Sequence, residues 1–347
     1  MYLKKIILAI VLIGLVIGSF FAYMVYNAFF SPNTTFMNEE AFVYIPSKAS
    51  FMDVKEMVAP LLDDIESFEA VAQRKQYSNN IKAGKYRIGK GMTNNEIVNA
   101  LRSGNIPVKV SFNNQETIED LAGRIATQIE ADSISLVEAF KEPEFLKEEG
   151  LDKETGIIIY IPNSYEFFWN TSAEDFRNRM LNEFHRFWNE KRQGKAKAAG
   201  LKIEEVMTLA SIVHKESAKV DERPRVAGVY LNRLKRGMLL QADPTVIYAL
   251  KRHLKNYDTI IKRVLYKDLE LDSPYNTYKY AGIPPGPITM PDISAIDAVL
   301  NAEQHNYLYF VANVEKFGYH KFAKTLTQHN RNKTQYIRWI NSQNINR

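Results

Sequence analysis

The chain has 347 residues, of which 46% are hydrophobic and 24% are charged. This composition is typical of a folded globular protein and argues against long disordered regions. The formal net charge is only +5 and the lysines are spread along the chain, which argues against a dedicated nucleic-acid binder. There are no cysteines, so disulfides and thiolate metal sites are excluded, while the redox compartment cannot be inferred.

The first thirty residues predict a membrane anchor. After Lys4 and Lys5 an apolar run extends from Ile6 to about Tyr26. As a helix this run would be about 31 Å long, close to the thickness of a hydrocarbon core. A cleaved signal peptide is the alternative, but its apolar region is shorter and a small-x-small cleavage site would follow. We therefore expect an uncleaved, single-pass anchor, which also disfavours a cytosolic protein.

The flanks of the run predict its orientation. Because Lys4 and Lys5 precede it, the N-terminus is expected in the cytoplasm of a cell with an inner (plasma) membrane, with the rest exported. Gly14 and Gly18 form a small-xxx-small pair, which alone is weak evidence for helix pairing. The aromatic residues expected at the outer interface are Tyr23, Tyr26, Phe29 and Phe30.

The rest of the chain predicts a mixed α+β protein with two folded parts. The predicted segments are a cytoplasmic tip and anchor at 1–30, a linker at 31–40, a small module at 41–112 and a larger catalytic domain at 113–347.

Within the small module, strands are expected at 41–45, 84–88 and 108–112. Ser50 with Asp53, and Thr93 with Glu96, are capping boxes that each open a helix. The resulting strand–helix–helix–strand order resembles a LysM-like carbohydrate-binding module, and a structural stalk is the alternative.

From 113 to about 200 the pattern is mainly helical. Thr117 with Asp120 caps one helix, the stretch 176–192 is amphipathic, and the apolar run 157–161 with the following 162–166 interrupts the helices. Neither a phosphate-binding glycine loop nor an HExxH motif occurs, so no cofactor is expected.

The chemistry is expected at the end of a helix between Ile203 and Ser217. Val206, Leu209, Ala210 and Val213 follow helical spacing, and the next position on this apolar stripe is Glu216. A carboxyl group on such a stripe is partly desolvated, which raises its pKa and suits it to general acid catalysis. A solvated glutamate at a helix end, with only its aliphatic stem packed, is the alternative.

The candidate substrate-binding residues lie in two segments after Glu216. Asp243 before Pro244 predicts an N-cap and the first position of a helix, and Gln241 and Thr245 flank it. A proline- and glycine-rich loop at 273–288 then displays Tyr275, Asn276, Thr277 and Tyr278, which are residue types common in binding sites. A strand is expected at 307–311.

Several motifs in one order resemble a known family, the YceG-like endolytic murein transglycosylases (MltG type), over nearly the whole chain. The motifs are Leu209–Ser217, Val229–Leu234, Leu240–Val246, Tyr275–Tyr278, Gly282–Gly286 and Tyr307–Ala312.

The resemblance implies that Glu216 is the catalytic acid and base. The Glu216–Ser217 pair also looks like the acid and its neighbour in goose-type lysozymes and soluble lytic transglycosylases, so a lysozyme-like domain is expected. Two residues depart from the family pattern, because relatives often carry an acid in place of His214 and an aspartate in place of Asn163. The residues expected to bind substrate are Ser217, Gln241, Asp243, Thr245, Tyr275, Asn276, Thr277 and Tyr278.

The implied reaction is cleavage of the bond between N-acetylmuramic acid and N-acetylglucosamine in nascent peptidoglycan, which leaves 1,6-anhydro ends and terminates strand elongation. The implied partners are glycan strands, the membrane and peptidoglycan synthases, with no nucleic acid.

Two rival hypotheses are a non-catalytic peptidoglycan-binding scaffold and a water-using muramidase. The muramidase needs a second carboxylate, for which Asp221, Glu222 and Asp243 are candidates. His214, His320 and His329 lack metal-ligand spacing, so no metal site is expected.

Overall fold

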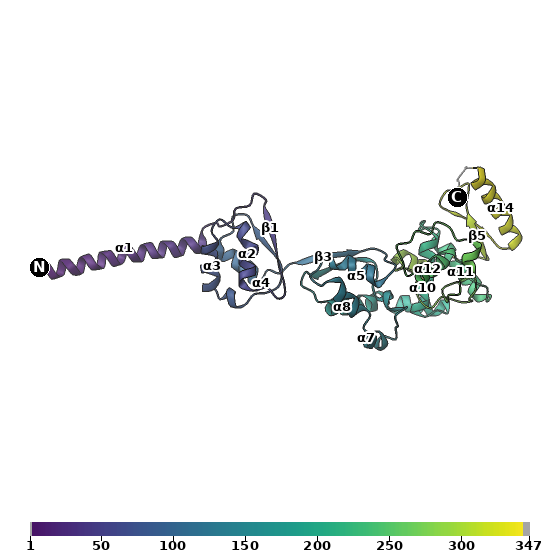
Figure 1. Ribbon diagram of the computed structural model, residues 1–347, viewed down its shortest axis with the longest axis horizontal. Coiled ribbons are helices and arrows are strands. Elements are labelled where there is room, and N and C mark those ends of the chain that lie inside the picture. Colours follow the sequence, from purple (N-terminus) through teal and green to yellow (C-terminus); the bar gives the residue numbers. More distant parts are fainter. Residues whose placement is uncertain (1, 343–347) are drawn as a thin grey trace. The chain divides into compact units, whose positions relative to one another are not determined.

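The computed structural model describes residues 2–342 and has a mixed α+β architecture (Figure 1). Its residues divide by contacts into two compact units. The first comprises the chain up to Val110 with Gln128–Ala131 and Tyr165–Ser172, and the second comprises Ser111–Thr127, Asp132–Ser164 and the chain from Ala173 onward. The sequence-based boundary after residue 112 stays a prediction.

The first element is a long apolar helix, α1 (Tyr2–Phe30), none of whose residues is buried. It is the one helix within the described residues that is long and apolar enough to cross a membrane. The predicted apolar segment thus forms one continuous helix, which is consistent with a single-pass membrane anchor.

The first unit continues with a small sheet flanked by helices. Strands β1 (Glu40–Ile45) and β2 (Gly84–Gly89) pair antiparallel, with Val43 opposite Tyr86. Between and after them lie α2 (Phe51–Val58), η1 (Ala59–Leu61), α3 (Ile65–Arg74), η2 (Tyr77–Asn79) and α4 (Asn94–Ser103).

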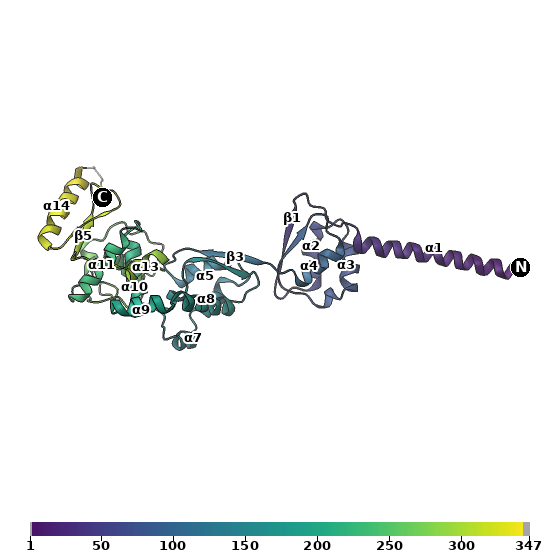
Figure 2. The same ribbon diagram turned by 180° about the vertical axis from the view of Figure 1, so that it is seen from behind.

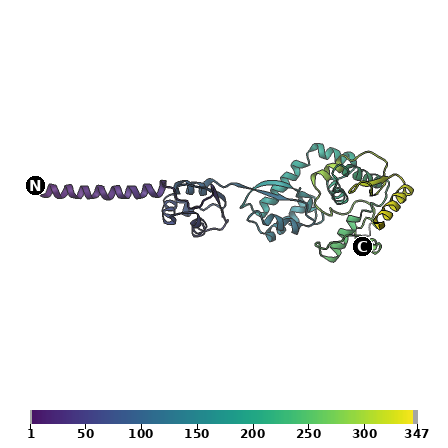
Figure 3. The ribbon, with the colours of Figure 1, turned by 90° about the horizontal axis from the view of Figure 1, so that it is seen from above.

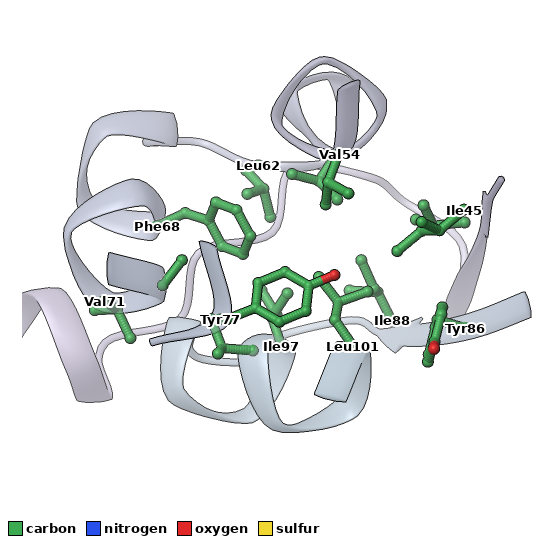
Figure 4. Close-up of a cluster of buried hydrophobic side chains, with 14 residues drawn as sticks. Ile45, Val54, Leu62, Phe68, Val71, Tyr77, Tyr86, Ile88, Ile97 and Leu101 are labelled. Atoms are coloured by element: carbon green, nitrogen blue, oxygen red, sulfur yellow. The ribbon is translucent and has the colours of Figure 1, made fainter. Parts of the chain in front are cut away.

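Both predicted capping boxes of this unit are present. The side chains of Ser50 and Thr93 accept hydrogen bonds from the backbone N–H groups of Asp53 and Glu96, and both acids reach back to the cap. The helices bury Val54, Phe68 and Leu101 against the sheet in one core (Figure 4). The core explains why so small a unit folds around a two-stranded sheet.

The segment between α1 and β1, predicted as a linker, is held against the first unit. Asn33 is buried: its side chain donates to Asn94 Oδ1 at 2.6 Å and accepts from the N–H of Asp64 at 2.7 Å. Asn94 also donates to the carbonyl of Ala28 in α1 at 2.9 Å. The end of α1 is therefore docked on the unit that follows it.

The second unit is mainly helical. It contains η3 (Gly156–Ile159), where the apolar run interrupts the helices, and the small sheet of β5 with β6. Its helices before residue 200 are α5 (Ile118–Ala126), α6 (Ser133–Phe140), α7 (Pro143–Glu148), α8 (Ala173–Phe187) and α9 (Glu190–Ala199). The strands β3 (Pro107–Phe112) and β4 (Asn163–Phe168) form a further two-stranded sheet, and each strand belongs partly to each unit.

The C-terminal half of this unit surrounds one central helix, α10 (Ile203–Glu216), as Figures 1 and 2 show. Every residue from Val206 to Val213 is buried, because α11, α12 and α13 all pack on it. The elements around and after it are α11 (Arg223–Lys235), α12 (Asp243–Leu254), η4 (Tyr266–Glu270), α13 (Ile293–Leu300), β5 (Tyr309–Ala312), β6 (His320–Ala323) and α14 (Leu326–Ser342). Figure 3 shows α14 beside the β5–β6 hairpin, which it contacts.

Candidate active site

A cavity of about 480 Å³ lies in the second unit where α10 ends. Its size is that of a typical small-molecule or sugar-binding pocket. One part of its lining comes from Glu216, Tyr230, Arg233, Leu240, Gln241, Asp243 and Tyr278. The other part comes from the β5–β6 hairpin and α14, through Tyr309, Phe310, Val311, Ala312, His320, Leu326, His329, Asn330 and Lys333.

Glu216 is the last residue of α10 and is half-buried at the wall of this cavity. Its Oε1 accepts a hydrogen bond from the phenol of Tyr230 on α11 at 2.8 Å. Tyr230 is itself buried and packs edge-on against Phe310. The predicted apolar stripe of α10 thus brings Glu216 into apolar surroundings with one hydrogen-bond donor.

Burial raises the pKa of Glu216 to about 7. The hydrogen bond from Tyr230 and the nearby His320 and Arg233 favour the carboxylate, while the charge of Asp243 opposes it. Desolvation outweighs the favourable contacts, so a large share of Glu216 carries its proton near neutral pH. A carboxyl group in this state can donate a proton to a leaving oxygen and then act as a base.

An ion pair between a buried arginine and a half-buried aspartate holds the chain immediately after Glu216. Arg223 donates from Nε to the carbonyl of Ser217 at 2.9 Å and from Nη1 to both oxygens of Asp292 at 2.8 Å. His214 lies with Nδ1 3.2 Å from Asp292 Oδ2. Although burial opposes it, the hydrogen bonds from His214 and Arg223 hold the pKa of Asp292 well below its ordinary value. His214 thus belongs to the support of the helix end, outside the cavity lining.

A second network lies beside it and includes the predicted binding residue Ser217. Ser217 is buried and donates to Glu222 Oε2 at 3.3 Å. The other partner of Glu222 is His320, whose backbone N–H and Nδ1 lie 2.8 and 2.7 Å from the carboxylate. These hydrogen bonds from His320 lower the pKa of Glu222 despite its burial. Ser217 therefore faces the protein interior instead of the cavity.

Three of the predicted substrate-binding residues line the cavity with Glu216, namely Gln241, Asp243 and Tyr278. The phenol of Tyr278 donates to Asp243 Oδ1 at 2.5 Å. Gln241 has φ 49°, a left-handed conformation that costs energy for a residue with a side chain. Its backbone N–H donates to the carbonyl of Thr277 at 3.0 Å, which holds it in that conformation.

The prediction that Asp243 is an N-cap is wrong by one residue. The N-cap of α12 is Ala242, and Asp243 occupies the first helical position without a capping hydrogen bond from its side chain. Proline is tolerated at the second position as well as the first, because neither N–H has a partner within the helix. The carboxylate is thereby directed to Tyr278 and the cavity.

The remaining predicted residues lie behind the cavity wall. Thr245 and Thr277 are buried, with their hydroxyls 2.8 Å apart, and Thr277 Oγ1 accepts from the N–H of Ala242 at 2.9 Å. Asn276 donates to the carbonyls of Leu269 and Leu271, and the phenol of Tyr275 donates to Glu154 at 2.8 Å. These four side chains hold the loop in place, so the structure does not bring them to the site.

Sequence reasoning missed the contribution of the C-terminal hairpin and helix, and of Tyr230 and Arg233. Arg233 is buried and donates to the carbonyls of Leu308, Leu239 and Leu240 at 2.6, 3.2 and 2.8 Å. A buried arginine in an otherwise apolar helix face is a signal that could have been used. Nothing local in the sequence places α14 at the cavity, since that depends on tertiary packing.

The other carboxylates considered for a second catalytic role lie elsewhere. Asp221 is exposed and accepts from the phenol of Tyr319 at 3.0 Å, and Glu222 is engaged by His320. Of the three candidates, only Asp243 lines the cavity. In residues 2–342 no group of three or more histidine, cysteine, aspartate or glutamate side chains could hold a metal ion.

Asn163 lies in a separate, open groove of about 730 Å³. Its Oδ1 accepts from the N–H of Ser164 at 2.8 Å, and Asn113, Asn114 and Arg124 line the same groove. The structure thus gives this residue no place in the cavity of Glu216.

The chain is similar in sequence to a known protein family and to several named bacterial proteins. The sequence profile of the YceG-like family matches residues 43–335. A protein of Bacillus subtilis (strain 168) named endolytic murein transglycosylase is 31% identical over 314 residues, which cover 85% of this chain and 84% of the relative. A protein of the same name from Streptococcus pneumoniae (strain D39) is 28% identical over 297 residues, which cover 78% of this chain.

The matched region spans 53% of the pneumococcal protein, about half its length. Among solved structures, a crystal structure of a yceG-like protein from Listeria monocytogenes matches with a TM-score of 0.57 and 29% sequence identity. That match covers 84% of this chain and 98% of the other. The family match over most of the chain and these similarities agree: this chain belongs to the YceG-like family.

Proposed function

We propose that the chain is an endolytic murein transglycosylase that cuts the β-1,4 bond between N-acetylmuramic acid and N-acetylglucosamine within glycan strands. The observation that carries this proposal is the carboxyl group of Glu216, half-buried in a cavity of about 480 Å³ with its pKa raised to about 7. The Bacillus subtilis relative, aligned over 84% of its length, bears the same activity in its name.

In the first step Glu216 gives its proton to the glycosidic oxygen, and the bond from that oxygen to C1 of muramic acid breaks. The 2-acetamido group of the muramic acid stabilises the developing positive charge. In the second step the Glu216 carboxylate takes the proton of the C6 hydroxyl, and O6 bonds to C1. The product is a 1,6-anhydro end, the carboxyl group is protonated again, and water is not consumed.

Around this group, Gln241, Asp243 and Tyr278 are placed to contact the sugars, because they line the cavity with Glu216. Thr277 has an indirect role: it accepts hydrogen bonds from the backbone N–H groups of Gln241 and Ala242 and so holds this segment in position. Tyr230 keeps the Glu216 carboxyl oriented through its 2.8 Å hydrogen bond.

Hydrolysis is a second candidate, and Asp243 is the observation in its favour. A water-using muramidase needs a second carboxylate across the bond. Asp243 lines the same cavity as Glu216, and its charge raises the pKa of Glu216. Against this role, Asp243 accepts a 2.5 Å hydrogen bond from Tyr278. The contact is equally consistent with a carboxylate that positions the sugars.

The finer parts of the biological setting belong to the same proposal. An inner-membrane location with a cytoplasmic N-terminus is supported by α1 and the preceding Lys4 and Lys5. A LysM-like role for the first unit is supported by its β1–α2–α3–β2 order. Action on nascent strands, and pairing with peptidoglycan synthases, would follow from an anchor next to the site of synthesis.

The test is cleavage of purified peptidoglycan by the full chain in detergent, with Glu216→Gln beside the wild type. Because a general acid typically contributes 100- to 10,000-fold, we expect the rate to fall by roughly that factor. Glu204→Gln is the matched control, since Glu204 lies in the first turn of the same helix, outside the cavity lining, and should cleave normally.

Mass spectrometry of the new ends separates the candidates. Anhydro ends support the transglycosylase, and reducing ends support the muramidase. Cleavage by Glu216→Gln at the wild-type rate would contradict the assignment, and an inactive wild type that still binds glycan would identify a scaffold.

A further inference from the structure

Helix α14 supplies one wall of the active-site cavity through a single face. Leu326, His329, Asn330 and Lys333 all line the cavity, and their spacing of three and four residues places them on the same side of the helix. Figure 1 shows this helix next to β5, at the C-terminal end of the second unit. Three of these four side chains are polar, and Leu326, Asn330 and Lys333 are exposed, so this face of the helix is accessible to a ligand in the cavity.

Lys333 is the cation of this wall that has no protein partner. In the part of the chain that the structure describes, its ammonium group has neither a carboxylate nor a hydrogen-bond acceptor. Arg233, the other permanent cation of the cavity, is buried and donates to three backbone carbonyls. Lys333 is exposed enough to meet a ligand from the cavity side.

The two histidines of the cavity do not replace it as cations. The Nδ1 of His320 lies 2.7 Å from the Glu222 carboxylate, so this ring already has a carboxylate partner within the protein. His329 stacks on Tyr309 at 5.2 Å between ring centres, and burial together with the charges of Lys333 and Arg233 lowers its pKa. The imidazole of His329 is therefore mainly uncharged at neutral pH.

The sugars of peptidoglycan differ in one feature that a cation can detect. Muramic acid carries a lactyl ether that ends in a carboxyl group, whereas glucosamine carries a hydroxyl at the same carbon. The lactyl carboxyl is a free carboxylate in peptide-free strands, and otherwise it is linked to a stem peptide that has carboxylates of its own.

We propose that Lys333 binds a carboxylate carried by the muramic acid at the scissile bond, and thereby sets the register in which the strand lies in the cavity. This inference rests on the proposed function, since it names the group of that substrate that the α14 wall recognises. A strand shifted by one sugar would place a neutral glucosamine against Lys333, so the ion pair favours the register that brings muramic acid C1 to Glu216.

The cavity also contains a negative charge, which is on helix α12. Asp243 begins α12, where Tyr278 donates to it, and it would repel a substrate carboxylate. Attraction at α14 and repulsion at α12 thus act in the same sense on the orientation of the strand.

The test measures KM and kcat of the full chain on three glycan preparations. The first is stripped of peptides and has free lactyl carboxylates, the second is the same material with those carboxylates converted to neutral methylamides, and the third retains its stem peptides. The variants are Lys333→Met, which removes the charge at similar length, and Lys333→Arg, which keeps it. Arg331→Met is the control, because it removes one charge from the same helix at a residue outside the cavity lining.

For the wild type we expect KM to be about fivefold lower on at least one carboxylate-bearing preparation than on the methylamide, the size of effect expected for a charge pair at a partly exposed site. Lys333→Met should lose this difference with kcat within about twofold of wild type, while Lys333→Arg and Arg331→Met should keep it. If Lys333→Met removes a lower KM on the stripped strands, the lactyl carboxylate is the group that Lys333 binds. If it does so only on the peptide-bearing strands, a carboxylate of the stem peptide is that group. Equal KM values for the wild type and Lys333→Met on all three preparations would overturn the proposal.

Binding to the Glu216→Gln protein, measured as Kd with and without Lys333→Met, separates this inference from the proposed function. If Lys333→Met weakens binding of carboxylate-bearing strands although the wild type cleaves none of them, the recognition stands and the enzymatic proposal fails. If the wild type cleaves normally and Lys333→Met changes neither Kd nor KM, the enzymatic proposal stands and the recognition fails.

Discussion

At the scale of single residues, the hydrogen bond from Tyr230 to Glu216 opposes the effect of burial on the carboxyl group. Burial favours the protonated form, and the phenol favours the carboxylate. As an acid, Glu216 is active when protonated, so kcat/KM should be highest below pH 7 and should fall about tenfold per pH unit well above it.

We therefore expect Tyr230→Phe to move this fall in kcat/KM to higher pH. Removing a hydrogen bond that stabilises the carboxylate raises the pKa of Glu216 further, and the fall should move by roughly one pH unit. Tyr319→Phe is the control, because the phenol of Tyr319 donates to Asp221 instead of Glu216. A fall that stays in place, or moves to lower pH, would show that Tyr230 does not act on Glu216 in this way.

The sequence was sufficient to place Glu216 at the end of an apolar helix stripe, but not to find its hydrogen-bond partner. The apolar stripe of α10 is local, so Val206, Leu209, Ala210 and Val213 could be assigned to the core and Glu216 to its edge. Tyr230 is fourteen residues away on the next helix, and its contact depends on how α10 and α11 pack. Likewise, Asn276 and Tyr275 have the composition of binding residues, but their hydrogen bonds to Leu269 and Glu154 could not be read from it.

At the scale of secondary-structure elements, the position of the end of α10 depends on α13. Asp292 caps α13 by accepting from the N–H of Ala295, and the same carboxylate pairs with Arg223, which holds the carbonyl of Ser217. The side chain of Arg223 is only 5% exposed. Loss of the Asp292 charge would leave a buried cation without its partner, which is costly.

Asp292→Asn should therefore destabilise the protein by about 2 kcal/mol and also lower kcat, with KM little changed. Asparagine retains the helix cap through its Oδ1, so the variant removes the charge and one acceptor oxygen while keeping the cap. Asp297→Asn on the same helix is the matched control, since its partner Arg192 is more exposed and the pair should contribute under about 1 kcal/mol. Thermal unfolding and steady-state kinetics give the comparison, and equal unfolding midpoints for the two variants would contradict the assigned role.

Elements with local signals were predicted well. The capping boxes at Ser50, Thr93 and Thr117 begin α2, α4 and α5 as expected, because side-chain and backbone partners are three residues apart. At Asp243 the local signal was ambiguous, because proline fits the first two helical positions equally, and the helix begins one residue earlier than predicted. The place of α14 at the cavity was not predictable, since it follows from long-range packing on β5 and β6.

At the scale of the whole molecule, the anchor and the first unit are joined without a free tether. Ala28 and Phe29 of α1 pack on the core of the first unit, and Asn94 binds the carbonyl of Ala28. The two-residue step from Phe30 to the buried Asn33 leaves little room for independent motion.

Inserting a flexible linker of about ten glycine and serine residues after Phe30 should add a reach of roughly 17 Å. With lipid-linked strands growing in proteoliposomes, we expect the glycan left attached to the membrane after cutting to become longer than with the wild type. The cutting of free glycan in detergent should not change, since the cavity is untouched. Unchanged lengths of the membrane-attached glycan would show that the junction does not limit where cuts occur.

The docked end of α1 has one further consequence. Where α1 spans a bilayer, a tilt or rotation of the helix must be carried over into the rest of the first unit, because the hydrogen bonds between Asn33, Asn94 and Ala28 couple the two. A glycan strand repeats the same disaccharide throughout, so nothing in its own structure indicates its length. Where α1 spans a bilayer, the lipid supplies an external reference that the protein can use, so bilayer thickness and composition become variables that act on the orientation of the first unit.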